Sequence, residues 1–374
     1  SEMCIRDRNN RVNGSLEVYW NTTKDLLMAV PVDNTTGYSY QFQNFGKTSN
    51  RGIELSVNVD VINKGDFRFN VGAIYNYNRN KLDELPNADQ YLYSSYWGSS
   101  SLVPTNDYMF VEGKAIGLVR GFISEGYYTV DDFNYTNGQY VLKEGVPDIT
   151  KALTATYMHP YDLPAGQTAF PGAAKFRDVD ESGTVDLDDA TCLGEVMPRH
   201  TGSFQLNFNY KNFDLSTNFN WTAGGKVYNV AAMINASGQE FDGIGAQRAS
   251  WVADAFKVYN VNAAGDLYAV TNPDELRALN ANAKYHLPYH QSGITSSEWL
   301  ENGSYLRLQT LTLGYTLPKN WLTKVHVDKI RLYLTATNLF TITGYSGIDP
   351  EVNANPTGQS GFYSDPVSYT HLRA

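Results

Sequence analysis

Cysteine is nearly absent from this chain of 374 residues, which contains only Cys4 and Cys192. Two cysteines cannot form a disulfide framework or a cysteine-rich metal site. Basic residues are also in deficit, because 29 lysines and arginines face 39 aspartates and glutamates, which gives a net charge of -10. Phosphate binding needs a basic surface, so we expect no nucleic-acid partner.

Long apolar runs are missing as well. The mean hydropathy is -0.39, and no stretch approaches the roughly 18 apolar residues that a transmembrane helix needs. A membrane barrel is not excluded, since its strands are apolar only at alternate positions. The sequence also lacks a G-x-S-x-G elbow, a P-loop and an H-E-x-x-H motif, so we expect no enzyme activity.

Aromatic residues are abundant, at 13% of the chain with 27 tyrosines. Tyrosine and tryptophan suit surfaces that are apolar on one side and wet on the other. Membrane-interface girdles and sugar-binding loops are two such surfaces.

Alternation of apolar and polar side chains is the main structural signal. In residues 202–221, one side carries aromatic and aliphatic residues and the other carries mainly Gln and Asn, with a break at Lys211-Asn212. Period two indicates strands, and the break indicates a hairpin. The same rhythm recurs in 16–21, 53–61, 67–77, 311–317 and 330–336.

The lengths of these runs favour a membrane barrel. Several reach the roughly 9 to 11 residues that a tilted strand needs to cross a bilayer, whereas strands in soluble sheets more often stop at about 5 or 6. Long polar segments at 82–112, 128–197 and 224–300 separate them. Long loops on one side and short turns on the other are typical of barrels. A soluble β-sandwich, which also alternates, remains the alternative.

Four segments resemble a known family. They are "TSNRGIELSVNVD" (48–60), "KFRDVDESGTVDLDD" (175–189), "YLRLQTLTLGYTLP" (305–318) and "IRLYLTATNLFTITGYSGIDPEVN" (330–353). In order and spacing they resemble the C-terminal half of TonB-dependent outer-membrane transporters of the SusC/RagA branch, and the likeness covers most of residues 9–365.

The resemblance implies an all-β fold, part of a 22-strand antiparallel transmembrane barrel with long extracellular loops, and an N-terminal plug. It implies import of glycan oligosaccharides or peptides, driven by the TonB complex and capped by a SusD-like surface lipoprotein. Outer-membrane lipid is the expected environment, in a Gram-negative cell.

The chain departs from the family pattern at both ends. The plug and the TonB-contacting segment are not found in it, nor is the aromatic-terminated last strand. About eight to ten strands are recognisable, fewer than half of the barrel. Residues 1–8 and 366–374 fit neither neighbouring pattern, and we expect both to be non-native.

Residues 178–189 match the spacing of a calcium-binding loop. Such loops place oxygen ligands at positions 1, 3, 5, 7, 9 and 12, with Gly at position 6. The ligands predicted from Asp178 onwards are Asp178, Asp180, Ser182, Thr184, Asp186 and Asp189. Asp189 replaces the usual bidentate Glu, and no amphipathic helices flank the loop. We predict a structural Ca²⁺ site in an extracellular loop; the alternative is a solvated acidic turn.

Two further groups of side chains are candidate sites. Tyr91, Tyr93, Tyr96 and Trp97 are placed in a polar loop, where flat rings could form a sugar platform or simply pack the loop. His286 and His290 have metal-ligand spacing on a helix, but Pro288 between them disfavours that geometry.

The favoured hypothesis is a transporter fragment with gated import as its mechanism. A secreted β-rich carbohydrate-binding or adhesion protein with a calcium loop is the alternative. A carbohydrate-active enzyme is a third possibility, but it requires a pair of carboxylates across a cleft, which a sequence cannot show.

Overall fold

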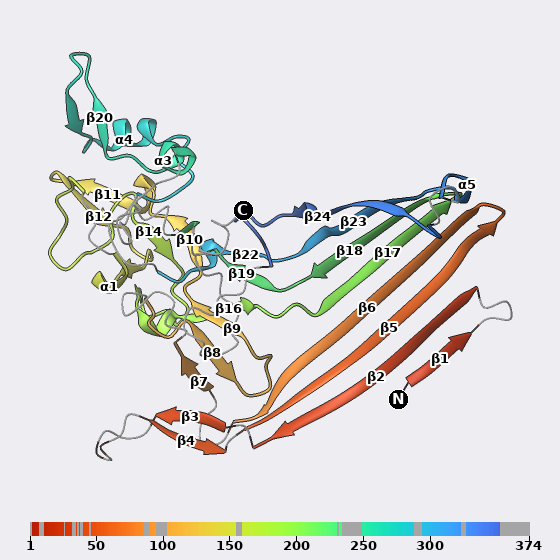
Figure 1. Cartoon of the computed structure of the whole chain (residues 1–374). Helices are drawn as coiled ribbons and strands as arrows, with labels where there is room; N and C mark the ends of the chain where they lie inside the picture. The colour runs from red at the N-terminus through yellow and green to blue at the C-terminus, as the bar shows by residue number, and fades with distance from the viewer. Residues whose placement is uncertain are drawn as a thin grey trace.

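One large antiparallel sheet dominates the computed structural model, which describes residues 2–6, 11–25, 27–31, 35, 37, 40–44, 46–85, 90–94, 103–154, 159–229, 232–233, 249–287, 294–322 and 327–351. Its eight strands run in the order β1-β2-β5-β6-β17-β18-β23-β24 (Figure 1). Their bounds are β1 Glu2–Arg6, β2 Val12–Lys24, β5 Lys47–Lys64, β6 Phe67–Glu84, β17 His200–Tyr210, β18 Phe213–Ala223, β23 Tyr305–Thr316 and β24 Arg331–Thr343.

The alternating segments of the sequence all lie in this sheet, which confirms the strand predictions. Residues of like polarity face each other across strands: Phe204 lies opposite Phe219, and Phe208 lies opposite Leu215. β5 and β6 each contain 18 residues, more than a tilted strand needs to cross a bilayer.

The apolar face of the sheet is uncovered. The exposed fraction is 65% for Trp20, 61% for Leu332 and 72% for Leu334. Within the part of the chain that the structure describes, no second sheet buries these side chains. The β-sandwich alternative is therefore wrong, because it requires this face to form a dry seam between layers.

Connections at the two ends of the sheet differ in length. At one end, β5 joins β6 through Gly65 and β17 joins β18 through Lys211, both in the positive-φ conformation that tight turns need. At the other end, residues 85–199 and 224–304 separate consecutive strands of the sheet. In outer-membrane barrels the short turns are periplasmic and the long loops extracellular.

The long extracellular segments fold into a second layer at that end of the sheet (Figure 1). It holds a four-stranded sheet, ordered β16-β9-β8-β7, and several two-stranded pairs. The strands are β3 Leu27–Pro31, β4 Tyr40–Asn44, β7 Gln90–Tyr93, β8 Tyr108–Val111, β9 Leu118–Gly121, β10 Ser124–Tyr127, β11 Phe133–Thr136, β12 Gln139–Leu142, β13 Asp148–Ile149, β14 Ala174–Phe176, β15 Thr184–Val185, β16 Thr191–Glu195, β19 Lys226–Tyr228, β20 Tyr259–Val261, β21 Leu267–Ala269 and β22 Leu300–Asn302.

Helices in the structure are short. In the described ranges they include α1 Lys151–Thr154, α3 Ala249–Asp254, α4 Pro273–Leu279 and α5 Lys319–Leu322, with 3₁₀ turns η3 Val130–Asp132, η4 Leu187–Asp189 and η5 Ser297–Trp299. α4 begins with Pro273 and is capped by the Asn272 side chain. Among the described residues, no helix is both long and apolar enough to cross a membrane.

The extracellular layer has hydrophobic cores of its own. The largest cluster includes Phe122, Tyr128, Phe170 and Leu276, each 2% exposed or less. This packing is why segments rich in polar residues still fold: a few large side chains in each segment meet in one core.

Residues 2–6 take part in the main sheet, where β1 pairs with β2 from Glu2 opposite Glu17 to Arg6 opposite Asn13. The non-native origin of residues 1–8 stays a prediction. Residues 366–374 lie outside the described residues.

Candidate functional site

Polar side chains form a hydrogen-bonded row across the inner face of the sheet. Asn70 of β6 donates to Asn58 of β5 over 2.7 Å, and Asn207 of β17 donates to Asn70 over 3.5 Å. Ser216 of β18 continues the row by donating to Asn207 over 2.7 Å. An inner face lined by amides and hydroxyls suits a water-filled or plugged lumen.

The opposite face carries aromatic rows near both ends of the strands. Toward the short turns, Phe213 lies 4.6 Å from Tyr315 between ring centroids. Toward the long loops, Tyr75 stacks with Trp221 at 6.1 Å. Aliphatic side chains and phenylalanines, among them the stacked pair Phe204 and Phe219, occupy the band between them. Two aromatic girdles around an apolar band are the pattern of a strand surface in a lipid bilayer.

Residues 178–189 lie in the extracellular layer, between β14 and β16. The middle of the loop is held by β15, which pairs in parallel with β13. Asp148, at the start of β13, fixes that strand by accepting hydrogen bonds from the backbone N–H groups of Thr168 and Ala169. The loop is therefore attached to the hydrophobic core at a defined register.

Carboxylates fold the loop by accepting backbone hydrogen bonds. Asp178 accepts from the N–H groups of Ser182 (3.1 Å) and Gly183 (2.7 Å). Asp189 accepts from those of Val179, Asp180 (3.3 Å) and, through its other oxygen, Asp186 (2.8 Å). Gly183 has φ +88°, a left-handed conformation that glycine adopts without strain.

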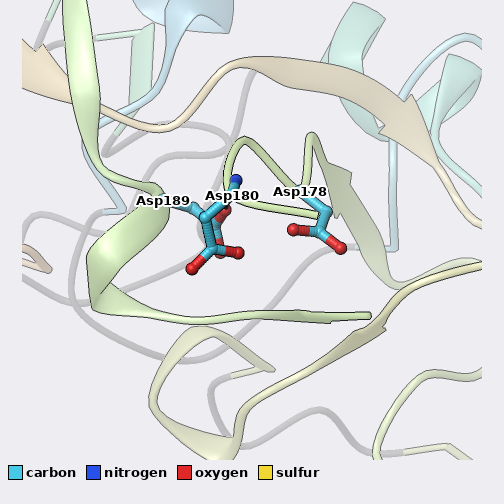
Figure 2. A group of neighbouring side chains, drawn as sticks. All are labelled: Asp178, Asp180 and Asp189. Atoms are coloured by element: carbon cyan, nitrogen blue, oxygen red, sulfur yellow. Dashed lines mark hydrogen bonds between the residues drawn. The ribbon is translucent and has the colours of Figure 1, made fainter. Parts of the chain in front are cut away.

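Three of the six predicted ligands converge. Oxygen atoms of Asp178, Asp180 and Asp189 all lie within 4.8 Å of one another (Figure 2). Each carboxylate oxygen has lone pairs beyond those used by backbone N–H groups, so the set retains capacity for a hard cation. Asp189 is fully buried, and no cationic side chain forms a salt bridge with any of the three in the described ranges.

The other three predicted ligands have different local partners. Asp186 caps η4 by accepting from the N–H group of Asp188 over 2.8 Å. The hydroxyl of Ser182 donates to the carbonyl of Thr184 over 3.0 Å. Hydrogen bonding by Ser182 also holds the pKa of Asp180 below its ordinary value. The fit to a cation therefore rests on three carboxylates.

The aromatic segment is only partly described. Tyr91 and Tyr93 lie in strand β7, within the long connection between β6 and β17; Tyr96 and Trp97 fall outside the described residues. The Tyr93 ring contacts the Phe110 ring edge to face, with 6.3 Å between the ring centroids. For Tyr93 this contact is the alternative in which the ring packs the loop. The sugar platform stays a prediction.

The histidines are accounted for by packing in the part that is described. His286 is buried, its Nδ1 lies 2.8 Å from the Leu287 carbonyl oxygen, and its ring contacts Trp251. His290 lies outside the described residues, so the predicted absence of a metal pair stays a prediction.

One ionic contact was not predicted. Arg307 of β23 donates to Glu351 over 2.7 Å and also to Asp349, which ties the "GIDPE" segment to the sheet. Arg307 is only 8% exposed, so its charge depends on these partners. An arginine among apolar strand residues was the only signal in the sequence.

Long antiparallel strands with an exposed apolar band, aromatic rows at both ends and a polar inner face define the wall of an outer-membrane β-barrel. An outward apolar band between aromatic rows is the face that such barrels turn to lipid.

The comparisons give the family. Residues 6–339 match the family described as "TonB dependent receptor-like, beta-barrel", and the chain belongs to it. The chain is similar to TonB-dependent receptor P3 of Formosa agariphila, at 29% identity over 97% of the chain, and to TonB-dependent receptor SusC of Bacteroides thetaiotaomicron, at 25% identity over 93%. It spans about a third of the length of these relatives, 32% and 29%.

The fold is similar to that of the RagAB peptide transporter, with a TM-score of 0.63 at 22% identity, covering 93% of this chain and 32% of that one. These findings confirm the resemblance to SusC/RagA-type receptors, the partial barrel and the outer-membrane location. They also confirm that the chain is not an enzyme, because the family comprises receptors and transporters.

Proposed function

We propose that this chain is the C-terminal barrel portion of an active importer of glycan oligosaccharides or peptides. Its strands form part of the outer-membrane wall, and its extracellular layer helps to receive the substrate. Import is gated: substrate captured outside is released inward when TonB displaces the plug. A SusD-like lipoprotein covers the extracellular end as a lid.

The folded extracellular layer is the observation that carries this proposal. A simple pore needs only short loops, whereas this chain devotes residues 85–199 and 224–304 to a layer with its own cores, set on the end of the sheet. Similarity to SusC and to the RagAB peptide transporter supports both substrate classes and a lipoprotein partner.

Uptake by the full-length parent protein tests the proposal. A deletion strain should lose growth on one substrate class, oligosaccharides or peptides, and recover it with the intact gene. Complementation with a variant that lacks the TonB-contacting segment should fail although the barrel is inserted. Normal uptake through that variant would contradict active import.

We also propose that Asp178, Asp180 and Asp189 bind a structural Ca²⁺ ion. Three carboxylates within 4.8 Å repel one another, and a divalent cation would remove that repulsion. Bound calcium would cross-link the start and end of the loop and so stabilise the extracellular layer. This role needs no helix movement, in keeping with a loop held by β13 and β15.

Limited proteolysis of the full-length protein with and without calcium tests the site. Calcium should protect residues 178–189, and Asp178→Ala should abolish the protection. Asp188→Ala is the matched control, since Asp188 lies in the same loop but outside the converging group. Equal cleavage with calcium and with chelator would mean that the loop is a solvated acidic turn and not a calcium site.

A further inference from the structure

Two arginines lie side by side on the outward face of the barrel wall. Arg51 of β5 lies directly opposite Arg79 of β6. Successive side chains of a strand point to opposite faces, and Arg51 shares the face of Ile53 and Leu55 because no bulge interrupts β5 between them. Arg79 shares the face of Tyr77 in the same way. Both arginines are exposed.

Like charges directly opposite each other on neighbouring strands are destabilising. Neither Arg51 nor Arg79 forms a salt bridge within the ranges that the structure describes. Arg51 does pack on the ring of Trp20, 3.5 Å from its centroid, which orients the guanidinium without neutralising it.

Nearby ions have other partners. Glu195 lines the same hollow as Arg79, but Arg199 already binds it with three hydrogen bonds, of 2.7, 2.8 and 3.1 Å. Lys81, further toward the loops, pairs with Asp83 at 3.3 Å. Arg51 and Arg79 thus form an uncompensated outward-facing pair.

The pair is located at one edge of the apolar band. On β5, the outward residues from Ile53 to Ile62 are aliphatic, and Arg51 is the next outward residue toward the long-loop end. Trp20 and Tyr77, beside the arginines, are residues typical of the membrane interface. The long-loop end is extracellular, so the pair lies at the headgroup level of the outer leaflet.

We propose that Arg51 and Arg79 bind the phosphate group of an anionic lipid of the outer leaflet. Guanidinium groups match phosphate oxygens with paired, charge-assisted hydrogen bonds. A phosphate between the two arginines would convert their repulsion into attraction to a shared anion. Trp20 and the aliphatic band beneath it would contact the acyl chains of the same lipid. This site depends on the membrane location and not on what the protein imports.

Native mass spectrometry of the purified full-length protein tests the site, with phosphorylated lipid A and its dephosphorylated form as probes. The wild type should bind the phosphorylated lipid more tightly. The double variant Arg51→Gln/Arg79→Gln should lose roughly tenfold or more in affinity for it, and little for the dephosphorylated form. Lys64→Gln/Lys211→Gln is the matched control: it removes two positive charges at the opposite, short-turn end.

Folding is checked by the heat-modifiable mobility of the barrel on gels. If the Gln variant fails to insert, Arg51→Lys/Arg79→Lys is used instead. It keeps both charges but loses the planar guanidinium groups, so it should bind the lipid more weakly than the wild type. Equal binding of both lipids, or equal binding by the wild type and folded variants, would overturn the proposal. Displacement of the lipid by inorganic phosphate would overturn the assignment to a lipid.

Discussion

Arg331 of β24 reaches across an intervening strand to Asp214 of β18, with Nε 3.0 Å from Oδ1 and a second bond from Nη2 to Oδ2. The strand between them, β23, presents Gly314 at that point: Gly314 lies opposite Asp214 on one side and Tyr333 on the other. A Cβ atom on Gly314 would lie 2.5 Å from both the guanidinium and the carboxylate. The absence of a side chain allows the ion pair to form over the strand.

Gly314→Ala should therefore break the Asp214–Arg331 pair while leaving the backbone register intact. We expect a loss of about 0.5 to 1 kcal/mol in the free energy of unfolding, since the pair is about a third exposed and is screened by water. Urea unfolding of the full-length barrel in lipid measures it. In the Asp214→Asn background, where the ion pair is already lost, Gly314→Ala should reduce the free energy of unfolding much less. An equal reduction in both backgrounds would show that the added methyl group does not act by disturbing the ion pair.

Arg307 should hold the segment after β24 against the sheet. Arg307→Ala leaves Asp349 and Glu351 without their shared partner and removes a nearly buried charge, so we expect hydrogen exchange at residues 344–351 to accelerate about tenfold or more. Arg307→Lys should give an intermediate exchange rate, because an ammonium group cannot reproduce the planar, paired hydrogen bonds of the guanidinium group. Unchanged exchange in the Ala variant would mean that the segment is held by other contacts.

Asp189 should stabilise its loop even without calcium. It accepts hydrogen bonds from three backbone N–H groups, of Val179, Asp180 and Asp186. Asp189→Ala leaves these donors without their acceptor at a buried position, at a cost of about 1 to 3 kcal/mol each when no water replaces it. Protease cleavage in chelator should therefore rise in Asp189→Ala and stay unchanged in Asp188→Ala. If Asp189→Ala resists the protease as well as the wild type does, the buried carboxylate does not stabilise the loop.

The alternation in the sequence was enough to predict the main sheet. Period two fixes which side chains share a face, so the outward Phe204 and the inward Asn207 were assigned correctly. The break at Lys211 marked the hairpin, because a positive φ at a polar position suits a tight turn. The spacing of the acidic loop likewise predicted that Asp178 and Asp189 would meet.

The alternation in the sequence could not predict the strand register or the tertiary contacts. The β5–β6 turn places Lys64 opposite Phe67, a register that would put Asn80 opposite Arg51. The bulge between Asp60 and Ile62 shifts the pairing by one residue and brings Arg79 there instead. Strands as short as β13 and β15, two residues each, carry no periodicity, and the N-cap role of Asp186 depends on a turn that ligand spacing does not encode.

Glu298 should make the stability of the extracellular layer depend on pH. It lies in η5, and burial raises the pKa of its carboxyl, while His286, whose Nε2 is 3.7 Å from Oε2, opposes the shift. A carboxyl whose pKa is higher in the folded state favours folding while it is protonated in both states. That contribution is present below its unfolded pKa and is lost as pH rises through the folded pKa.

Glu298→Gln is neutral at every pH and avoids this loss. Hydrogen exchange at residues 294–300 should therefore be slower in the variant than in the wild type at pH 8, and similar in both proteins at pH 4, with each pH compared separately. Glu144→Gln, at an exposed position of the same layer, is the control and should leave these rates unchanged. Faster exchange in Glu298→Gln at pH 8 would show that the charged carboxylate stabilises the layer.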